Sequence, residues 1–439
     1  MNLHRLLSKR IEEGRPVRVG LIGAGKFGSM FLSQVPTTPG IEVAAIADLS
    51  PDRAREACRR VGWDEARIGA TRFLDDTIAM IASPGIEVIV EATGHAPAGI
   101  AHARRAIAEG KHIVMVNVEA DVLAGPLLAR EAAQAGIVYS LAYGDQPALI
   151  CELVDWARSC GFRVIAAGKG TKYLPAYHAS TPETVWGYYG LTAEQARVGG
   201  MNAKMFNSFL DGTKSGIEMA AVANATGLTP PPDGLAFPPC GSHELAEVLR
   251  PGNTGALHHA GQVEVVSSQH RDGSDVRNDL RWGVFVVFEA PNDYAMRCFR
   301  EYGVVTDPSG RFSALYRPFH LIGLELNVSI LSATLRGEPT GVASGFRGDV
   351  VATAKRDLRA GETLDGEGGA CVWGKLMPAA DSLRIGGLPI GLASGVTLLH
   401  DVPSGQAVQW DHVRVNADDP ACSYRRKMET EFAGLAMGN

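Results

Sequence analysis

The side chains best placed for chemistry are lysines that stand beside glycines and carboxylates. Lys169 and Lys172 come directly after an apolar stretch that predicts a strand ending at 167, and Lys214 begins an alanine-rich stretch that predicts a helix over 212–225. Lysines flanked by glycines at a strand end can hold a phosphate or carboxylate, and a solvated turn is the open alternative. At helical spacing one face is shared by Asp211, Lys214, Ser215 and Glu218. Lys214 could deliver charge to a substrate oxygen, or it could form a structural pair with Asp211 at the helix start.

A second group of residues forms a glycine-rich turn near the N-terminus. Gly23, Gly25 and Gly28 have the spacing G-x-G-x-x-G between an apolar strand and a predicted helix. The first glycine permits a tight turn, the second lets a pyrophosphate approach the backbone, and the third lets the helix pack on the strand. Asp48 ends the next apolar stretch about 20 residues later, where a carboxylate binds the ribose of a dinucleotide. The predicted cofactor residues of this region are Gly23, Ala24, Gly25, Lys26, Phe27, Gly28 and Asp48.

The choice between NAD and NADP stays open on these residues. Asp48 favours NAD, because a carboxylate repels the ribose 2′-phosphate of NADP. Arg53 stands five positions later and could hold that phosphate, or it could belong to a solvated helix face. We therefore expect NADP or NAD as the cofactor.

Polar residues follow the predicted strands that alternate with helices. Apolar stretches over 86–91, 112–116 and 137–143 are separated by stretches with helical character. This alternation predicts a doubly wound parallel sheet, whose ligands gather beyond the carboxyl ends of the strands. Topology alone therefore places these residues on the ligand side: Thr93, Gly94, Asn117, Glu119, Asp145 and Gln146.

Composition limits the classes of protein that fit. The 439 residues are 46% hydrophobic and carry a formal net charge of −6, so no basic face argues for nucleic acid. The seven cysteines include no C-x-x-C pair, which favours buried free thiols over disulfides or a zinc site. No apolar run is long enough for a membrane span, and the charged N-terminal stretch has no secretory core. We expect a cytoplasmic protein that binds neither nucleic acid nor membrane.

The predicted fold class is α/β with three domains. A Rossmann dinucleotide-binding domain is expected over 1–168, and an α+β substrate-binding, catalytic and dimerisation domain over 169–343. Beyond a linker-like stretch over 336–345, the sequence pattern changes to short predicted strands separated by turn residues. This predicts a small β-rich domain with a helical tail over 344–439.

Six segments carry a resemblance that spans nearly the whole chain. They are GAGKFG, EGKHIVMVNVEAD, YGDQPALI, LDGTKSGIEMAAVANATG, VVATAKRDLRAGETL and LPIGLASGVTLLHDVPSGQAVQWDHV. Together they resemble the homoserine dehydrogenase-like oxidoreductases with a C-terminal SAF domain. Within that family the chain looks most similar to the branch that resembles 1-deoxy-D-xylulose 5-phosphate reductoisomerase.

The resemblance implies reduction of a phosphorylated keto sugar, with 2-C-methyl-D-erythritol 4-phosphate as product in isoprenoid precursor synthesis. It also implies a homodimer that forms through the middle domain. The implied catalytic residues are Lys214, Asp211, Glu119 and Lys204. The implied substrate residues are Asp145, Gln146, Lys169, Lys172, Asn202 and Arg317, with Lys204 as a further phosphate contact.

Two departures from the family pattern affect the expected site. Val118 replaces the lysine that follows the asparagine in homoserine dehydrogenases, which points to a different substrate. Asp145 matches the first acid of the metal-binding D-x-E of reductoisomerases, but Pro147 stands where the second acid would be. A Mg²⁺ or Mn²⁺ site at Asp145 would then need Glu119 or Glu152 to complete it.

Two other functions fit the sequence. One is a homoserine dehydrogenase or sugar-acid dehydrogenase, whose small substrate does not need a cluster of cations. The other is a cofactor-binding regulator or scaffold in which the SAF domain is the working part. The density of polar residues at strand ends argues against the second, because a scaffold has no need to keep them together.

Overall fold

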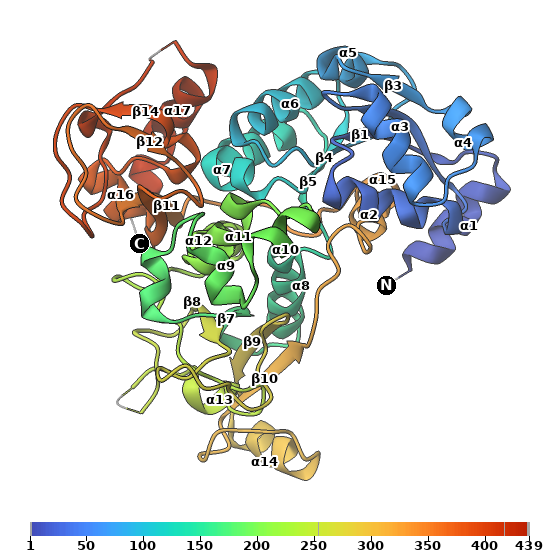
Figure 1. Ribbon diagram of the computed structural model, residues 1–439. Coiled ribbons are helices and arrows are strands. Elements are labelled where there is room, and N and C mark those ends of the chain that lie inside the picture. Colours follow the sequence, from blue (N-terminus) through green and yellow to red (C-terminus); the bar gives the residue numbers. More distant parts are fainter. Residues whose placement is uncertain (1, 253, 417, 437–439) are drawn as a thin grey trace. The chain divides into compact units, whose positions relative to one another are not determined.

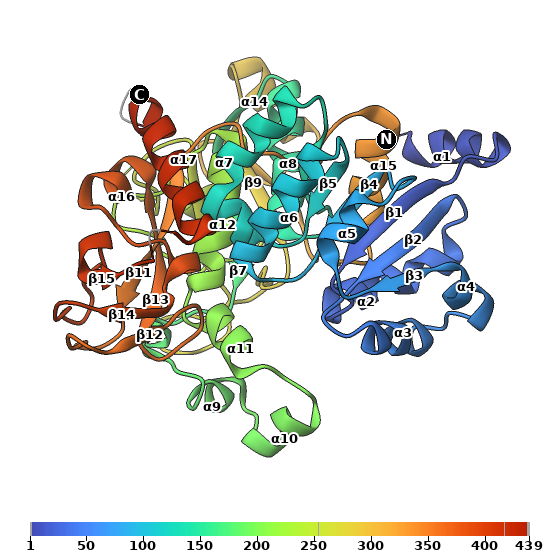
Figure 2. The same cartoon turned by 90° about the horizontal axis from the view of Figure 1, so that it is seen from above.

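The structure is a computed structural model that describes residues 2–252, 254–416 and 418–436. It divides into two compact units, whose elements are labelled in Figures 1 and 2. The first unit runs to Glu152 and is completed by His320–Ser344. The second contains Leu153–Phe319 and the chain from Gly345 onward.

These units divide the chain differently from the predicted boundaries at 168 and 343. Residues 153–168, expected in the dinucleotide domain, lie in the second unit. Residues 320–343, expected in the substrate domain, lie in the first. The chain therefore passes between the units three times.

The sheet of the first unit has six parallel strands in the order β3-β2-β1-β4-β5-β6. The strands are β1 Val17–Ile22, β2 Ile41–Ala47, β3 Arg72–Leu74, β4 Val88–Glu91, β5 His112–Met115 and β6 Tyr139–Leu141. The helices are α1 Leu3–Glu12, α2 Lys26–Gln34, η1 Val35–Thr37, α3 Pro51–Arg60, α4 Glu65–Ala70, α5 Thr77–Ala82, α6 Ala96–Ala108, α7 Val118–Gln134 and α15 Asn327–Arg336. Helix α8 Gln146–Ser159 begins in this unit and ends in the second. This order, with helices between successive strands, confirms the predicted doubly wound sheet.

The returning segment with α15 completes the far edge of this sheet. The Leu141 N–H donates to the carbonyl oxygen of Gly341 at 2.7 Å, and the Thr340 hydroxyl donates to the Leu141 carbonyl at 2.8 Å. The Tyr143 N–H donates to the Ser329 hydroxyl oxygen at 2.7 Å. These bonds satisfy backbone groups at the edge strand β6, so the sheet depends on residues far along the chain.

The largest sheet described in the second unit has four strands in the order β10-β9-β7-β8, in which β7 and β8 are parallel and the other pairs antiparallel. The strands are β7 Arg163–Thr171, β8 Gln262–Ser267, β9 Val284–Glu289 and β10 Phe312–Arg317. The helices before the C-terminal region are η2 Pro175–Ala179, α9 Val185–Tyr189, α10 Ala193–Val198, α11 Ala203–Leu210, α12 Thr213–Thr226, α13 Leu245–Val248 and α14 Asp293–Glu301.

Strand β7 runs four residues further than the expected end at 167. Gly168 and Gly170 were expected to follow the strand, but they lie inside it. A Cβ at Gly168 would lie 1.7 Å from the Glu264 carbonyl oxygen, and one at Gly170 would lie 2.0 Å from the Leu280 carbonyl oxygen. The glycines therefore allow close approach of neighbouring backbone, which a pattern-based turn prediction does not distinguish.

The C-terminal part of the second unit is rich in β-structure, as predicted. β11 Gly348–Ala354 pairs antiparallel with β13 Val372–Pro378, and β12 Thr363–Asp365, β14 Ser394–Leu398 and β15 Val413–Arg414 form a separate sheet. Its helices are α16 Ala379–Ile385, η3 Ile390–Leu392, η4 Trp410–His412 and α17 Pro420–Ala436. No helix in the described part of the chain is both long and apolar enough to cross a membrane.

Helix α12 links the four-stranded sheet to the β11–β13 ribbon. It contacts β7 and β8 as well as β11 and β13. Gly216 faces the ribbon, where a Cβ would lie 3.1 Å from the Gly374 carbonyl oxygen. The side chain of Glu218 reaches Lys169 on β7. Most of the helix is buried, so its few polar residues must find partners inside the protein.

Candidate functional site

The glycine turn has the geometry that its spacing predicts. Gly23 has a φ of 91°, and a Cβ there would lie 2.9 Å from the Ala92 carbonyl oxygen. Gly28 packs so closely that a Cβ would lie 2.2 Å from the Gly23 carbonyl oxygen. At Gly25, by contrast, a Cβ would meet no atom within 4 Å. Open space at this position, where α2 begins, is what a bound pyrophosphate requires.

Asp48 follows β2 and forms a hydrogen bond to the same turn. Its Oδ2 accepts the Ala24 N–H at 2.9 Å, and its Oδ1 accepts the Ser50 N–H at 3.0 Å. Arg53 is exposed at the start of α3, and Lys26 and Phe27 open α2. The predicted residues of this region therefore lie around the carboxyl ends of β1 and β2, where a dinucleotide fits.

Gly25→Ala is expected to lower the affinity for NADPH and NADH by about tenfold or more. The φ of −69° suits alanine and the new methyl group meets no protein atom, so only the space for the ligand changes. Titration of nicotinamide fluorescence measures the affinity, and a thermal melt confirms unchanged stability. Gly69→Ala, which is equally uncrowded but lies on α4, is the matched control. Unchanged affinity in Gly25→Ala would contradict a pyrophosphate at this turn.

A buried polar network joins the ends of β4 and β5. Glu91 is fully buried, and its Oε1 accepts the Thr93 hydroxyl at 2.6 Å and contacts His102 Nδ1 at 3.1 Å. Asn117 donates to the Thr93 hydroxyl oxygen at 3.3 Å and caps α7 by accepting the Ala120 N–H at 3.1 Å. Among the predicted cofactor residues, Thr93 and Asn117 are thus brought into contact, and Gly94 follows Thr93. Sequence reasoning missed Glu91 and His102, because a carboxylate ending an apolar run was interpreted only as part of a strand.

The residues predicted to hold a metal have other partners. Asp145 is buried before α8, where its Oδ1 accepts the Gln146 N–H at 2.9 Å. A Cβ at Gly144 would lie 2.8 Å from the Leu321 carbonyl oxygen, so this turn is tightly packed. Glu119 lies half-buried in the first turn of α7. Within the described residues, no group of three or more His, Cys, Asp or Glu side chains could hold a metal ion. The chain therefore does not fit a Mg²⁺ or Mn²⁺ centre at Asp145.

Lys169 and Glu218 form a buried ion pair between β7 and α12. Lys169 lies opposite Val284 of β9, and Arg317 of β10 lies opposite the same valine from the other side. Residues paired in this way point to one face of a sheet, so the side chains of Lys169 and Arg317 lie on the same face. The structure thus brings two of the predicted phosphate residues to one face.

Lys214 lies in the first turn of α12 and is half-buried. It stands four residues before Glu218, so both side chains project from the same side of the helix. Lys214 and Glu218 therefore project from one side of α12, and Lys169 of β7 contacts Glu218 on that side. The sequence predicts that Glu218 shares a helix face with Lys214, and the structure agrees. The sequence does not single out Glu218 as a site residue, because the partner Lys169 is 49 residues away.

Asp211 does not share a helix face with Lys214, which corrects the prediction. Gly212 has a left-handed conformation with a φ of 90° and separates Asp211 from α12, which begins at Thr213. The Asp211 Oδ2 accepts the Lys355 ammonium at 2.7 Å, and its Oδ1 accepts the Thr213 N–H at 2.9 Å. Burial raises the pKa of this carboxyl group, and the charge of Lys355 opposes that rise. Both carboxylate oxygens are thus engaged in tying α12 to the C-terminal β-rich part.

The remaining predicted substrate residues make local contacts. Lys172 donates to the Tyr188 carbonyl oxygen at 2.6 Å, and burial lowers the pKa of its ammonium group. Lys204 is exposed and donates to the Asp365 carbonyl oxygen at 2.8 Å. Asn202 is the N-cap of α11, whose first turn donates a backbone N–H to it at 3.3 Å. These bonds hold segments of the second unit to one another.

His178 completes a cluster that sequence reasoning missed, because it lies in a stretch without a clear period. Its Nδ1 donates to the Asp211 carbonyl oxygen at 2.7 Å, and its Nε2 accepts the Tyr173 hydroxyl at 2.9 Å. The ring stacks on Trp373 with 3.9 Å between centroids. Burial lowers the pKa of His178 to about 4, so the imidazole is neutral at physiological pH.

His178→Gln is expected to make the free energy of unfolding fall less steeply between pH 6.5 and pH 4. The unfolded chain binds a proton at His178 near pH 6.5, whereas the folded chain does so only near pH 4, so stability falls as pH drops through this window. The residue accounts for up to about 3 kcal/mol of that loss. Urea unfolding at pH 7, 6, 5 and 4 measures it, with exposed His4→Gln as the control. An unchanged pH dependence in His178→Gln would contradict the neutral buried imidazole.

Three family models match successive parts of the chain. Residues 17–116 match the oxidoreductase family with an NAD-binding Rossmann fold, and residues 144–326 match the catalytic domain of oxidoreductase DRL. Residues 349–414 match the SAF domain. No curated protein gives a significant match.

The chain is also similar to parts of solved structures. A biliverdin reductase from Synechocystis sp. PCC 6803 is 19% identical with a TM-score of 0.27, over 36% of this chain and 48% of that one. The 3-ketoreductase KijD10 from Actinomadura kijaniata is 19% identical with a TM-score of 0.26, over 36% and 50%. A probable dehydrogenase from Thermotoga maritima is 15% identical with a TM-score of 0.39, over 74% and 91%. The match therefore spans about half the length of the first two chains.

The family models agree with the geometry of the glycine turn and of the parallel sheet. The chain combines an NAD-binding Rossmann domain, an oxidoreductase catalytic domain and an SAF domain. The matched regions thus include an NAD-binding domain and an oxidoreductase catalytic domain.

Proposed function

We propose that the chain reduces a phosphorylated keto sugar by a reductoisomerase-like reaction, converting 1-deoxy-D-xylulose 5-phosphate to 2-C-methyl-D-erythritol 4-phosphate. The observation that carries the proposal is the placement of Lys169, Lys214 and Glu218 on one side of α12. All three lie inside residues 144–326, which match the catalytic domain of oxidoreductase DRL. A phosphorylated substrate needs several cations, and Arg317 shares the sheet face of Lys169.

The proposed chemistry places charge on substrate oxygens. The carbon skeleton rearranges to an aldehyde, and a bound nicotinamide dinucleotide supplies the hydride that reduces it. Lys214 is the proposed cation at the carbonyl oxygen, where a fixed charge in a water-poor site stabilises a developing negative charge strongly. Glu218 is the proposed acceptor for the hydroxyl proton whose loss starts the rearrangement. Lys169 orients Glu218 through their buried ion pair.

The proposal contains no metal step, because the described residues do not fit a metal centre. This same observation favours a second candidate, a dehydrogenase that acts on a small hydroxy acid such as homoserine or a sugar-derived acid. Such a reaction needs hydride transfer and a proton relay, but no skeleton rearrangement. It also needs fewer cations, so loss of Arg317 would change its KM less.

The test is oxidation of NADPH and NADH by the full chain, with and without Mg²⁺ or Mn²⁺. The substrates are 1-deoxy-D-xylulose 5-phosphate and aspartate semialdehyde, the oxidised partner of homoserine. The proposal expects turnover of the sugar phosphate without added metal. Turnover of the semialdehyde alone would favour the second candidate. A strict requirement for metal would contradict the roles given to Lys214 and Glu218.

A further inference from the structure

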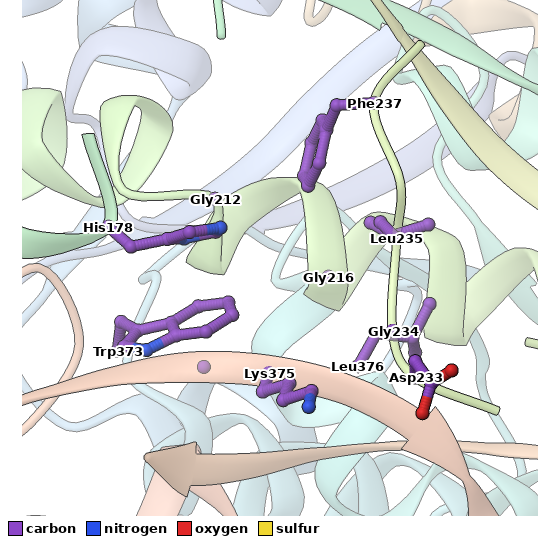
Figure 3. A pocket seen from close by; sticks show the side chains of 11 residues that line it. His178, Gly212, Gly216, Asp233, Gly234, Leu235, Phe237, Trp373, Lys375 and Leu376 are labelled. Carbon is purple, nitrogen blue, oxygen red and sulfur yellow. The ribbon is translucent and has the colours of Figure 1, made fainter. Parts of the chain in front are cut away.

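The second unit contains a pocket on the other side of α12. Its volume is about 200 Å³, and it lies between Gly212 and Gly216 of the α12 region, a loop over 233–237, and β13 (Figure 3). Drug-sized ligands occupy sites of roughly 300–1,000 Å³, so this pocket suits a small metabolite.

The pocket is separate from the proposed catalytic side. Gly216 lines the pocket and faces Gly374 of β13, whereas Glu218 reaches β7. Residues two apart on an α-helix project about 200° from each other. The same geometry places Lys214 away from the pocket. The body of α12 therefore lies between the two sites.

Three of the residues that line the pocket carry aromatic rings: His178, Phe237 and Trp373. His178 stacks on Trp373, and Phe237 stacks on Tyr173 with 3.9 Å between ring centroids and 15° between planes. Figure 3 shows the rings of His178, Trp373 and Phe237 along one end of the pocket. Rings held in this way present apolar and π surfaces without further loss of side-chain freedom on binding.

The loop that carries Phe237 is anchored by a buried carboxyl group. Glu264 of β8 accepts the backbone N–H groups of Ala236 at 3.1 Å and of Phe237 at 3.3 Å. Burial raises the pKa of Glu264 to about 7. Phe237 itself has a φ of 50°, which is unusual for a residue with a side chain. The conformation of this wall is thus imposed by hydrogen bonds within the protein.

Two opposite charges line the pocket without pairing to each other. Lys375 is half-buried on β13 and Asp233 is exposed on the loop. Neither has an ion pair or a side-chain hydrogen bond to the described residues. The positive charge of Lys375 acts on the His178 ring, because it contributes to the lowered pKa of His178. One ligand can therefore meet a cation and an anion in the same pocket.

We propose that this pocket binds a small zwitterion of the α-amino acid class. Lys375 pairs with the ligand carboxylate, and Asp233 pairs with the ammonium group. The rings of Trp373 and Phe237 pack against the ligand side chain. A phosphate dianion fits less well, because only one cation lines the pocket and Asp233 repels a second negative charge.

The test is calorimetric titration of the full chain with glycine, L-alanine, L-serine, L-threonine and L-leucine. The matched probes are the N-acetyl derivative and the methyl ester of each amino acid, which lack one charge. At least one free amino acid is expected to bind with a Kd below about 10 mM, and its two derivatives at least about tenfold more weakly. Lys375→Met and Asp233→Asn are each expected to weaken binding by a similar factor. Lys9→Met, an exposed lysine on α1, is the matched control.

Several results would overturn the proposal. These are no binding of any free amino acid, equal binding of a derivative, or unchanged binding in Lys375→Met. Tighter binding of gluconate or glycerol 3-phosphate at this pocket would assign it to another class of ligand. Lys214→Met separates this proposal from the proposed function, because turnover should be lost while amino acid binding is kept. Loss of amino acid binding in a folded Lys214→Met variant would place the ligand on the catalytic side of α12.

Discussion

Lys214→Met is expected to lower kcat by about 100- to 1,000-fold, the range seen when one fixed donor to a developing oxyanion is removed. The variant keeps the length and apolar character of the stem but has no charge for the carbonyl oxygen. Because the interaction is strongest in the transition state, kcat and kcat/KM should fall together while KM changes little. Steady-state oxidation of NADPH with the sugar phosphate measures both constants.

Lys9→Met is the control for the loss of a lysine, since this side chain lies exposed on α1. Its kinetic constants should equal those of the unaltered chain. Glu218→Gln provides a second measurement, because removing a proton acceptor should abolish the acidic limb of the pH–rate profile. A kcat within about threefold of normal in a folded Lys214→Met variant would exclude the proposed role.

Lys355→Met is expected to lower the free energy of unfolding by about 3–5 kcal/mol, because it leaves the buried Asp211 carboxylate without its cation. Lys355 also donates to the carbonyl oxygens of Ser180 at 2.6 Å and Gly369 at 2.7 Å. Without the lysine, the raised pKa of Asp211 favours protonation in the folded state. The deficit should therefore be smaller at pH 5 than at pH 8, which urea unfolding at the two pH values measures.

Two variants isolate the buried charge as the cause. Adding Asp211→Asn to Lys355→Met removes the unpaired carboxylate and should restore part of the lost stability. Arg359→Met breaks an exposed ion pair with Asp401 and should leave the unfolding midpoint unchanged. Equal effects of Lys355→Met and Arg359→Met would contradict the burial of the Lys355–Asp211 pair.

The parts of the fold and site that the sequence predicts well depend on local spacing. Gly23, Gly25 and Gly28 stand within six residues, and each has the environment that its position in the motif requires. The strands that follow are short apolar runs separated by helices, so their parallel order could be deduced from alternation. Thr93 and Asn117 were placed together by topology, and the structure brings their side chains into contact.

The parts that could not be predicted depend on partners far along the chain. The two glycines that flank Lys169 left open whether it holds an anion or lies in a solvated turn. Only β8 and the chain at Leu280 show why those glycines lie in a strand. The partner of Asp211 is 144 residues away. His178 and Trp373 come together from the catalytic and β-rich parts, and neither lies in a periodic pattern. Local pattern does not encode such contacts, which arise only when the elements pack.

The return of α15 to the first unit affects how the protein is made. Ser329, Thr340 and Gly341 hold the edge of its sheet, yet they leave the ribosome long after Glu152. At about 5–20 residues per second, the intervening chain takes roughly 10–40 s to synthesise. While the rest of the chain is translated, the edge strand β6 of the nascent nucleotide-binding region therefore lacks its hydrogen-bond partners from the returning segment. During that interval it should bind chaperones, and a message truncated after codon 152 should yield an aggregation-prone product.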